Sequence, residues 1–509
     1  MQKIIRNTFG LARTPHPRGT RHGGAGVRAR RVLLVALMAA VFGFASTAAG
    51  AATTPRRVTS PEMLTSPAPG KWTEIGTTNS GGPAAMWRAP DNRDWVMWAP
   101  NSTTYDLALL APDGGIAAGR KVAMKWAGLA NNPTLISNGS TPLVVFSGMN
   151  GGKYDYGCIV GAVPGAPYWT PTGWSLSSAC DSSNVGWGSA AVNAKGVISA
   201  AYGAIGGGVF YQIGVSPFIP SPGTDPSFLN GMGPENEYHD VVDSDGNGDF
   251  YLAFNRYFAT PASGDGVLVK DLSSNGPLVQ APRSSTYNTS TAPNSQPVAF
   301  ANRTGSGGGV FAAYCVGNSC SHLVLWRDGA KHARVVPDSA GAFFYEMASG
   351  PGGRLWIAWM TRNASTLYTV RTNEADTKFG PVEKYATPLF TVDSFAISGG
   401  PLGRLDVTAA GDNNSLKPVF LATQSLTALT LSGGGTIANT TSNKVTFVVT
   451  DAGDPVAGVK VSVDGHTALT NPAGKAVVTF AKGTSPGSYT VRASEANYFP
   501  AHGSVLVEK

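Results

Sequence analysis

The chain has 509 residues, enough for two or three domains with hydrophobic cores of their own. Only 14% of the residues are charged, against about 25% in typical soluble proteins, and 64 glycines and 35 prolines favour turns and short strands over long helices. The net charge of +7 arises in the first 51 residues, which hold eight basic residues and no acidic one, so the remainder carries −1. Such a neutral body excludes electrostatic attraction to nucleic acid or to an anionic membrane, and we expect neither as a partner.

Residues 1–51 have the order of a signal peptide. Basic residues precede an apolar run at 32–45, and Ala49-Gly50-Ala51 forms an A-x-A cleavage site. The run is shorter than the ~20 residues that a membrane-spanning helix needs, which disfavours an uncleaved anchor. Arg30-Arg31 matches a twin-arginine export signal only in part, so the export route stays open. We expect a secreted, extracellular bacterial protein that is a monomer, with residues 52–70 as a linker.

A polar or glycine-rich turn followed by an almost wholly apolar strand recurs about seven times between residues 71 and 425. Strands that are apolar on both faces indicate sheets that are covered on both sides. The units are 45 to 60 residues apart, and a four-stranded propeller blade needs roughly 40–50 residues plus any longer loops. The pattern therefore predicts an all-β fold with a six- or seven-bladed β-propeller. The spacing is counted between one residue near the start of each apolar strand: Trp95, Leu143, Val197, Phe250, Val310, Leu355 and Leu405.

Two stretches carry a family resemblance. The turn-and-strand unit resembles the blades of sialidase-like and related sugar-active propellers. The segment 400–407, together with Asp412-Asn413-Asn414-Ser415-Leu416, is similar to a blade of propeller lectins. The resemblance implies a propeller that recognises sugars. The intact S-x-D-x-G-x-T-W boxes of sialidases are missing from the sequence, so sialidase activity is not expected.

The composition changes at residue 426, after which tryptophan no longer occurs. The stretch Gly433-Gly434-Gly435 is interpreted as part of a linker, and alternating apolar and polar residues then predict half-buried strands. The patterns D-x-x-x-P-V-x-G-V-x-V, T-N-x-x-G and G-x-Y-x-V resemble carboxypeptidase regulatory-like and bacterial Ig-like modules. The resemblance implies a β-sandwich over 426–509 that acts as a spacer or accessory binding unit, without peptidase activity.

Four cysteines in an exported chain indicate two disulfides, for which three pairings exist. Cys315 and Cys320 enclose four residues that are typical of a hairpin tip, and this pair leaves Cys158 with Cys180 by elimination. The spacings fit neither a zinc site nor a C-x-x-C redox motif.

The densest polar cluster lies at residues 235–249. The order E-x-E-x-H-D followed by D-x-D-G-N-G is loosely similar to one blade of certain propeller polysaccharide lyases, in which a histidine acts on the sugar. For cleavage, His239 would be the base, Glu237 the neighbouring carboxylate and Arg256 the group that holds an acidic sugar. Glu235 and Tyr257 are candidate ligand contacts. The competing interpretation is an ordinary turn and strand with one ordinary histidine.

Calcium is the candidate cofactor. Asp243, Asp245 and Asn247 alternate as oxygen ligands do in calcium loops, and Gly248 follows them. Against this, Phe254 stands where an EF-hand has its closing carboxylate, and D-G-N-G forms a turn without any metal.

Tryptophan rings are flat apolar surfaces that can stack on sugars, although most of them pack inside proteins. Trp169, Trp174 and Trp187 lie in glycine- and serine-rich stretches and are the candidates for ligand binding. The sequence therefore favours a non-catalytic binder of a glycan or surface polymer. The alternatives are an extracellular polysaccharide-cleaving lyase or hydrolase centred on His239, and a structural surface protein.

Overall fold

The computed structural model describes residues 69–509 apart from 79–83, 90–91, 102–103, 111–115, 124–132, 138–141, 151–152, 165–168, 176–184, 205–207, 216–226, 230–235, 258–265, 275, 285–297, 304–307, 317–319, 362–365 and 401–402, and for some strand residues it describes the backbone alone. No α-helix occurs in these residues, and the segment Pro351–Gly353 forms one turn of 3-10 helix. None of the described helical structure is long and apolar enough to cross a membrane.

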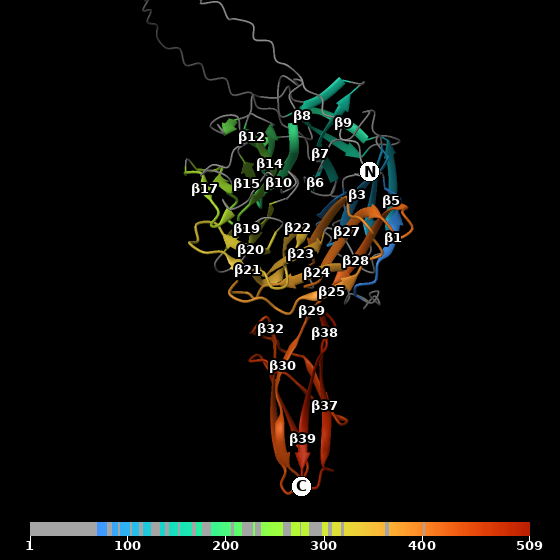
Figure 1. Ribbon diagram of the computed structural model, residues 1–509, viewed down its shortest axis with the longest axis vertical. Coiled ribbons are helices and arrows are strands. Elements are labelled where there is room, and N and C mark those ends of the chain that lie inside the picture. Colours follow the sequence, from blue (N-terminus) through green and yellow to red (C-terminus); the bar gives the residue numbers. More distant parts are fainter. Residues whose placement is uncertain are drawn as a thin grey trace, which may run out of the picture. The chain divides into compact units, whose positions relative to one another are not determined.

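Seven four-stranded antiparallel sheets, from β1 to β28, form the blades of a propeller (Figure 1). In the first six blades four consecutive strands lie in order across the sheet. In the seventh blade the outermost strand is β1, which pairs with β28, so the N-terminal strand completes the last blade. The predicted all-β propeller is confirmed, and it has seven blades.

The strands of each blade are given from the ring axis outwards. Blades 1 to 4 consist of β2 (Ala84–Arg88), β3 (Asp94–Asn101), β4 (Thr104–Leu110), β5 (Ile116–Ala123); β6 (Thr134–Ser137), β7 (Pro142–Asn150), β8 (Lys153–Pro164), β9 (Trp169–Ser175); β10 (Val185–Val192), β11 (Ile198–Ala204), β12 (Gly208–Val215), β13 (Ser227–Leu229); and β14 (Asn236–Ser244), β15 (Phe250–Tyr257), β16 (Gly266–Asp271), β17 (Val279–Gln280). Blades 5 to 7 consist of β18 (Ala299–Arg303), β19 (Gly309–Val316), β20 (His322–Arg327), β21 (Arg334–Val335); β22 (Ala342–Ser349), β23 (Leu355–Thr361), β24 (Thr366–Arg371), β25 (Glu383–Ala386); and β26 (Ser394–Gly399), β27 (Leu405–Asp412), β28 (Pro418–Ser425), β1 (Thr73–Gly76).

The first strands of the seven blades surround the ring axis and run parallel to one another. Each lies beside the first strand of the next blade, and β26 lies beside β2, which closes the ring. Hydrogen bonds join the carboxyl-terminal parts of neighbouring first strands: the Val242 N–H donates to Ser189 Oγ at 2.9 Å, and the Asn302 N–H donates to Asp243 Oδ2 at 2.8 Å. The ends of the first strands therefore define one face of the ring, here called the turn face. The opposite face, at which first strands begin and second strands end, is called the loop face.

A five-residue turn leads from the first to the second strand of a blade and explains the repeat in the sequence. In blades 3, 4 and 7 the fourth turn residue is a glycine with positive φ, and its N–H donates to the carbonyl of the first turn residue at 2.9–3.1 Å. In blades 4, 6 and 7 a side chain of the preceding blade donates a hydrogen bond to the carbonyl of the glycine at this fourth position, so the turn also joins blade to blade. These bonds are Asn193 Nδ2 to Gly248 O at 2.7 Å, Arg303 Nε to Gly353 O at 2.6 Å and Arg371 Nη1 to Gly403 O at 2.7 Å.

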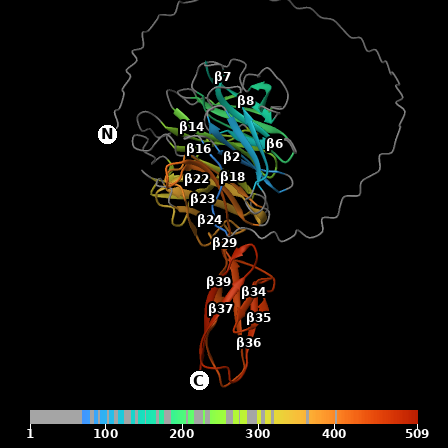
Figure 2. The same ribbon diagram turned by 90° about the vertical axis from the view of Figure 1, so that its right-hand side faces the viewer.

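The chain after blade 7 forms two further sheets that pack on one apolar core, which is a β-sandwich (Figure 2). Its core includes Phe447 and Val478 from one sheet and Val461, Val491 and Val505 from the other. The further assignment as an Ig-like or carboxypeptidase regulatory-like module stays a prediction. The sheets are β30 (Thr430–Gly433), β32 (Asn443–Asp451), β33 (Asp454–Pro455), β36 (Lys475–Phe480) and β31 (Gly435–Ala438), β39 (Ala501–Glu508), β37 (Gly487–Ser494), β34 (Lys460–Val463), β35 (His466–Leu469).

The interpretation of Gly433-Gly434-Gly435 as a linker is wrong. Gly433 ends β30 in one sheet and Gly435 begins β31 in the other, so the chain crosses between sheets at this point. All three residues have φ near +100°, and a Cβ on Gly433 would lie 2.3 Å from the Thr446 carbonyl oxygen. The glycines are required by a crossing inside the sandwich.

The hairpin staple is confirmed, because Cys315 in β19 and Cys320 before β20 form a disulfide. Cys158 lies in β8, whereas Cys180 lies outside the described residues, so their pairing stays a prediction. The signal peptide and nearly all of the predicted linker also lie outside the described residues.

Candidate functional site

The structure divides the polar cluster of residues 235–249 between the two faces of the propeller. Strand β14 begins at the loop face with Asn236 and ends at the turn face with Ser244. Glu237 and Asp245 are eight residues apart along this extended segment, which corresponds to about 26 Å at ~3.3 Å per residue. The candidate catalytic residues and the candidate calcium ligands therefore belong to two different places.

The loop-face half of β14 carries the candidate catalytic residues. Strand register pairs Glu237 with Arg256 and Asn236 with Tyr257. The register then shifts between Tyr238 and Val241, so His239 lies in an irregularity of the strand. Such bulges re-aim side chains and occur often beside active sites. Glu235 lies outside the described residues, and the structure describes His239, Glu237 and Tyr257 by their backbones alone.

The surroundings of Arg256 bear on the expectation that this residue holds an acidic sugar. Its side chain is buried, with a relative exposure of 4%, and it has contacts within the protein. A buried guanidinium offers little surface to a polymer, and the role of Arg256 in holding an acidic sugar stays a prediction.

The three candidate tryptophans are separated in the same way. Trp169 begins β9, the outermost strand of blade 2, at the turn face. Trp174 lies one residue before the end of β9, and Trp187 lies two residues after the start of β10, both toward the loop face. Trp174, Trp187, Glu237 and Tyr257 thus share the loop face of three consecutive blades.

The candidate calcium ligands have structural roles at the turn face. Asp245 Oδ1 accepts hydrogen bonds from the N–H groups of Asn247 and Asp249, both at 2.9 Å, and Asp245 Oδ2 accepts one from Asn247 Nδ2 at 3.0 Å. Asn193 is the first residue of the equivalent turn in blade 3, and its Oδ1 accepts the same pair of backbone bonds. An uncharged amide suffices there, so this turn needs no cation.

Asp243 links blade 4 to blade 5. Its Oδ2 accepts the Asn302 N–H and its Oδ1 accepts the Ser244 N–H at 2.7 Å. Burial raises the pKa of Asp243 to about 6, against the lowering effect of these two bonds. Among the described residues no group of three or more His, Cys, Asp or Glu side chains is arranged to hold a metal ion, and calcium binding stays a prediction.

Glu346 is a candidate proton or hydrogen-bond donor that the sequence pattern does not reveal. It lies in β22, the axis-lining strand of blade 6, between Phe344 and Ala348, which pack against the apolar core shared with blade 7. Its carboxyl has no hydrogen-bond partner among the described residues, and desolvation by the surrounding protein raises the pKa of Glu346 to about 8. A carboxylic acid that keeps its proton near neutral pH can donate that proton or a hydrogen bond. A single glutamate in an apolar strand has no sequence motif by which to recognise it.

A second acid with a raised pKa, Asp94, takes part in the contact that closes the ring. Arg88 Nη2 lies 2.9 Å from Asp94 Oδ2 in its own blade and 2.7 Å from Asp406 Oδ2 in blade 7. Burial first, and then the Asp406 carboxylate, raise the pKa of Asp94 to about 8. The shared arginine joins the first and last blades at the turn face, which is a structural role.

No protein-family model matches the chain, and no curated protein matches it. Solved structures with some similarity include the alpha-L-arabinanase of Penicillium chrysogenum in complex with arabinobiose, with 12% identity, 70% of this chain and 98% of that chain covered, and a TM-score of 0.38. The SapL1 lectin in complex with alpha methyl fucoside has 12% identity, covers 61% and 98% of the two chains and has a TM-score of 0.37. An ulvan lyase of polysaccharide lyase family PL25 has 9% identity, 67% and 78% coverage and a TM-score of 0.32. At these identities and TM-scores we draw nothing from them about ligand or activity.

Proposed function

We propose that the protein is an extracellular glycan-binding protein whose propeller holds the polymer at the loop face of blades 2 to 4. The observation that supports it most is the strand register of blade 4, which sets Glu237 opposite Arg256 and Asn236 opposite Tyr257 at that face. Carboxylates and aromatic rings are the groups that bind sugar hydroxyls and sugar faces. Trp174 and Trp187 lie toward the same face of the two preceding blades.

The test incubates the secreted protein with chitin, cellulose, xylan and polygalacturonate, and measures protein depletion and released sugar fragments in the same tubes. Depletion without fragments is the expected result. Tyr257→Ala and Glu237→Gln should each weaken depletion at least about tenfold, the size of one lost contact of about 1.4 kcal/mol. The matched control is Lys195→Ala, an exposed residue of the turn face in blade 3. Equal depletion by all three variants would refute the proposed surface, and no depletion by any of the four polymers would count against glycan binding.

Polysaccharide cleavage centred on His239 is the second candidate, and the observation that favours it is the irregularity of β14 between Tyr238 and Val241 at the same face. If the wild-type protein releases fragments, His239→Ala should abolish release and leave depletion unchanged. Glu346→Gln tests the carboxylic acid of blade 6 in the same assay. Repeating both assays with a calcium chelator tests whether Asp243, Asp245 and Asn247 hold a cation that binding requires.

A further inference from the structure

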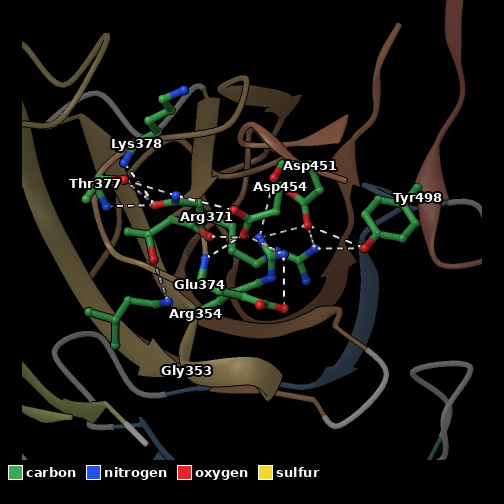
Figure 3. Close-up of polar contacts among 12 residues, drawn as sticks. Gly353, Arg354, Arg371, Glu374, Thr377, Lys378, Asp451, Asp454 and Tyr498 are labelled. Carbon is green, nitrogen blue, oxygen red and sulfur yellow. Dashed lines mark hydrogen bonds and ion pairs between the residues drawn. The ribbon is translucent and has the colours of Figure 1, made fainter. Parts of the chain in front are cut away.

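The β-sandwich and the propeller are joined by a charged cluster that is largely buried (Figure 3). Asp451, at the end of β32, has a side chain with 0% exposure. Its Oδ2 forms an ion pair with Arg371 of β24 and lies 3.2 Å from Nη1 of Arg354, which precedes β23. The two arginine side chains are themselves 3% and 9% exposed. One carboxylate of the sandwich is thus the shared counter-ion of two buried arginines of blade 6.

Arg354 and Arg371 also contact further groups of the propeller and of the sandwich. Arg354 Nη2 lies 2.8 Å from Asp454 Oδ2, and that oxygen accepts the Glu374 N–H at 2.7 Å. The guanidinium of Arg371 lies over the rings of Trp356 in the propeller and Tyr498 in the sandwich, at 5.2 and 5.6 Å from their centroids. These contacts place the charge of both arginines against groups of the sandwich as well as of the propeller.

The backbone at the junction leaves little freedom. Leu426 alone separates β28 of blade 7 from β29 (Thr427–Ala428), and β29 pairs in parallel with β38 (Tyr498–Phe499) of the C-terminal region. Phe499 packs against the core cluster shared by blades 6 and 7, with its ring centroid 6.2 Å from that of Tyr385. A flexible linker of the kind that separates independent modules is not present at this junction, all of whose residues the structure describes.

We propose that the β-sandwich is a fixed part of the propeller, held to blade 6 by Asp451 as the common counter-ion of Arg354 and Arg371, and that it is not a mobile spacer. Removing one partner of a buried ion pair leaves an uncompensated charge and strongly destabilises the state in which it is buried. In this junction that state is the docked one, because separation returns both arginines to water. The inference does not depend on which ligand the loop face binds.

The test uses Asp451→Asn in the full secreted chain, with Asp464→Asn as the matched control at an exposed turn of the sandwich. The wild-type protein and the control should unfold in one calorimetric transition and resist proteolysis between residues 425 and 430. Asp451→Asn should show two transitions and at least about tenfold faster cleavage at the junction, because tenfold corresponds to only about 1.4 kcal/mol of lost docking. A single transition with wild-type protease resistance would overturn the proposal.

A second pair of variants keeps the test informative if Asp451→Asn does not fold. Asp454→Asn removes a partly exposed partner of Arg354, so it should fold and accelerate cleavage at the junction to a smaller degree. The double variant Asp451→Asn with Arg371→Met replaces the buried pair by neutral groups. Its cleavage rate at the junction should be lower than the rate expected from adding the free-energy effects of the two single variants. Wild-type cleavage of Asp454→Asn, or additive effects in the double variant, would contradict a shared ionic lock.

Discussion

Glu346 shows how a single residue can set a pH dependence. The pKa of its carboxyl is raised to about 8 by the protein around it, so the folded state favours the protonated acid more than the unfolded state does. A group with a raised folded-state pKa contributes stability that is fully present below its ordinary pKa of 4.5 and is lost as the pH rises through 8. Above pH 8 the charged carboxylate of Glu346 therefore lowers the free energy of unfolding.

We predict that Glu346→Gln removes this cost. The free energy of unfolding of the variant should exceed that of the wild-type protein at pH 9 by on the order of 2–4 kcal/mol, with a much smaller difference at pH 4. Urea denaturation at several pH values between 4 and 9 measures the difference. A constant difference across this range would show that the Glu346 carboxyl does not change its ionisation on folding.

At the residue scale, the sequence predicts local features and misses those assembled from a distance. Cys315 and Cys320 lie in one hairpin, so their spacing indicates the disulfide directly. Asp451 and Arg371 are 80 residues apart and belong to different sheets, and neither lies in a motif. The proximity of Glu237 to the candidate calcium ligands in the sequence is misleading, because a strand carries them to opposite faces.

At the element scale, the repeated turn explains why the blades can be found in the sequence. The turn requires a residue with positive φ at its fourth position, which glycine adopts at no steric cost. At Gly403, with φ +80°, the requirement is stronger, because an added Cβ would lie 2.6 Å from Arg371 Nη1. The glycine thus permits both the turn and the approach of the arginine that binds its carbonyl.

We predict that Gly403→Ala lowers the free energy of unfolding more than Gly196→Ala does. Gly196 occupies the same position in blade 3 with φ +75°, and an added Cβ would meet no atom within 4 Å, so its substitution adds only backbone strain of about 1 kcal/mol. Gly403→Ala adds the displacement of Arg371 and should cost about 2–4 kcal/mol. Chemical denaturation of both variants compares them, and equal losses would refute a role for the Arg371 contact.

The strands that the sequence predicts best are those with the most uniform burial. Leu355 to Met360 are all buried, and this second strand of blade 6 is the clearest apolar run in the chain. The crossing at Gly433 to Gly435 could not be told from a linker, since glycine runs are typical of both. The distinction depends on the carbonyl of Thr446, which approaches from a strand later in the sequence.

At the scale of the whole molecule, closure of the ring depends on a strand that no repeat in the sequence reveals. Strand β1 has four residues and pairs with β28 through Thr73 with Ala422 and Gly76 with Phe420. Ile75 packs in the core between blades 7 and 1, with Trp98 and Phe420. The first strand of the described chain thus covers the outer edge of the last blade.

We predict that a protein beginning at Thr77 is less stable and more prone to aggregate than one beginning at Glu62. Without β1, the N–H and C=O groups of β28 form an open sheet edge, which is a template for pairing with another chain. The loss of Ile75 also opens the core beside Trp98, and Gly76 no longer covers the indole, from which an added Cβ would be 2.8 Å away. Thermal unfolding with light scattering measures both effects, and the midpoint should fall by several degrees, about 2–4 °C for each kcal/mol lost in a domain of this size. Equal midpoints and equal scattering of the two proteins would contradict this prediction and would show that blade 7 is complete with three strands.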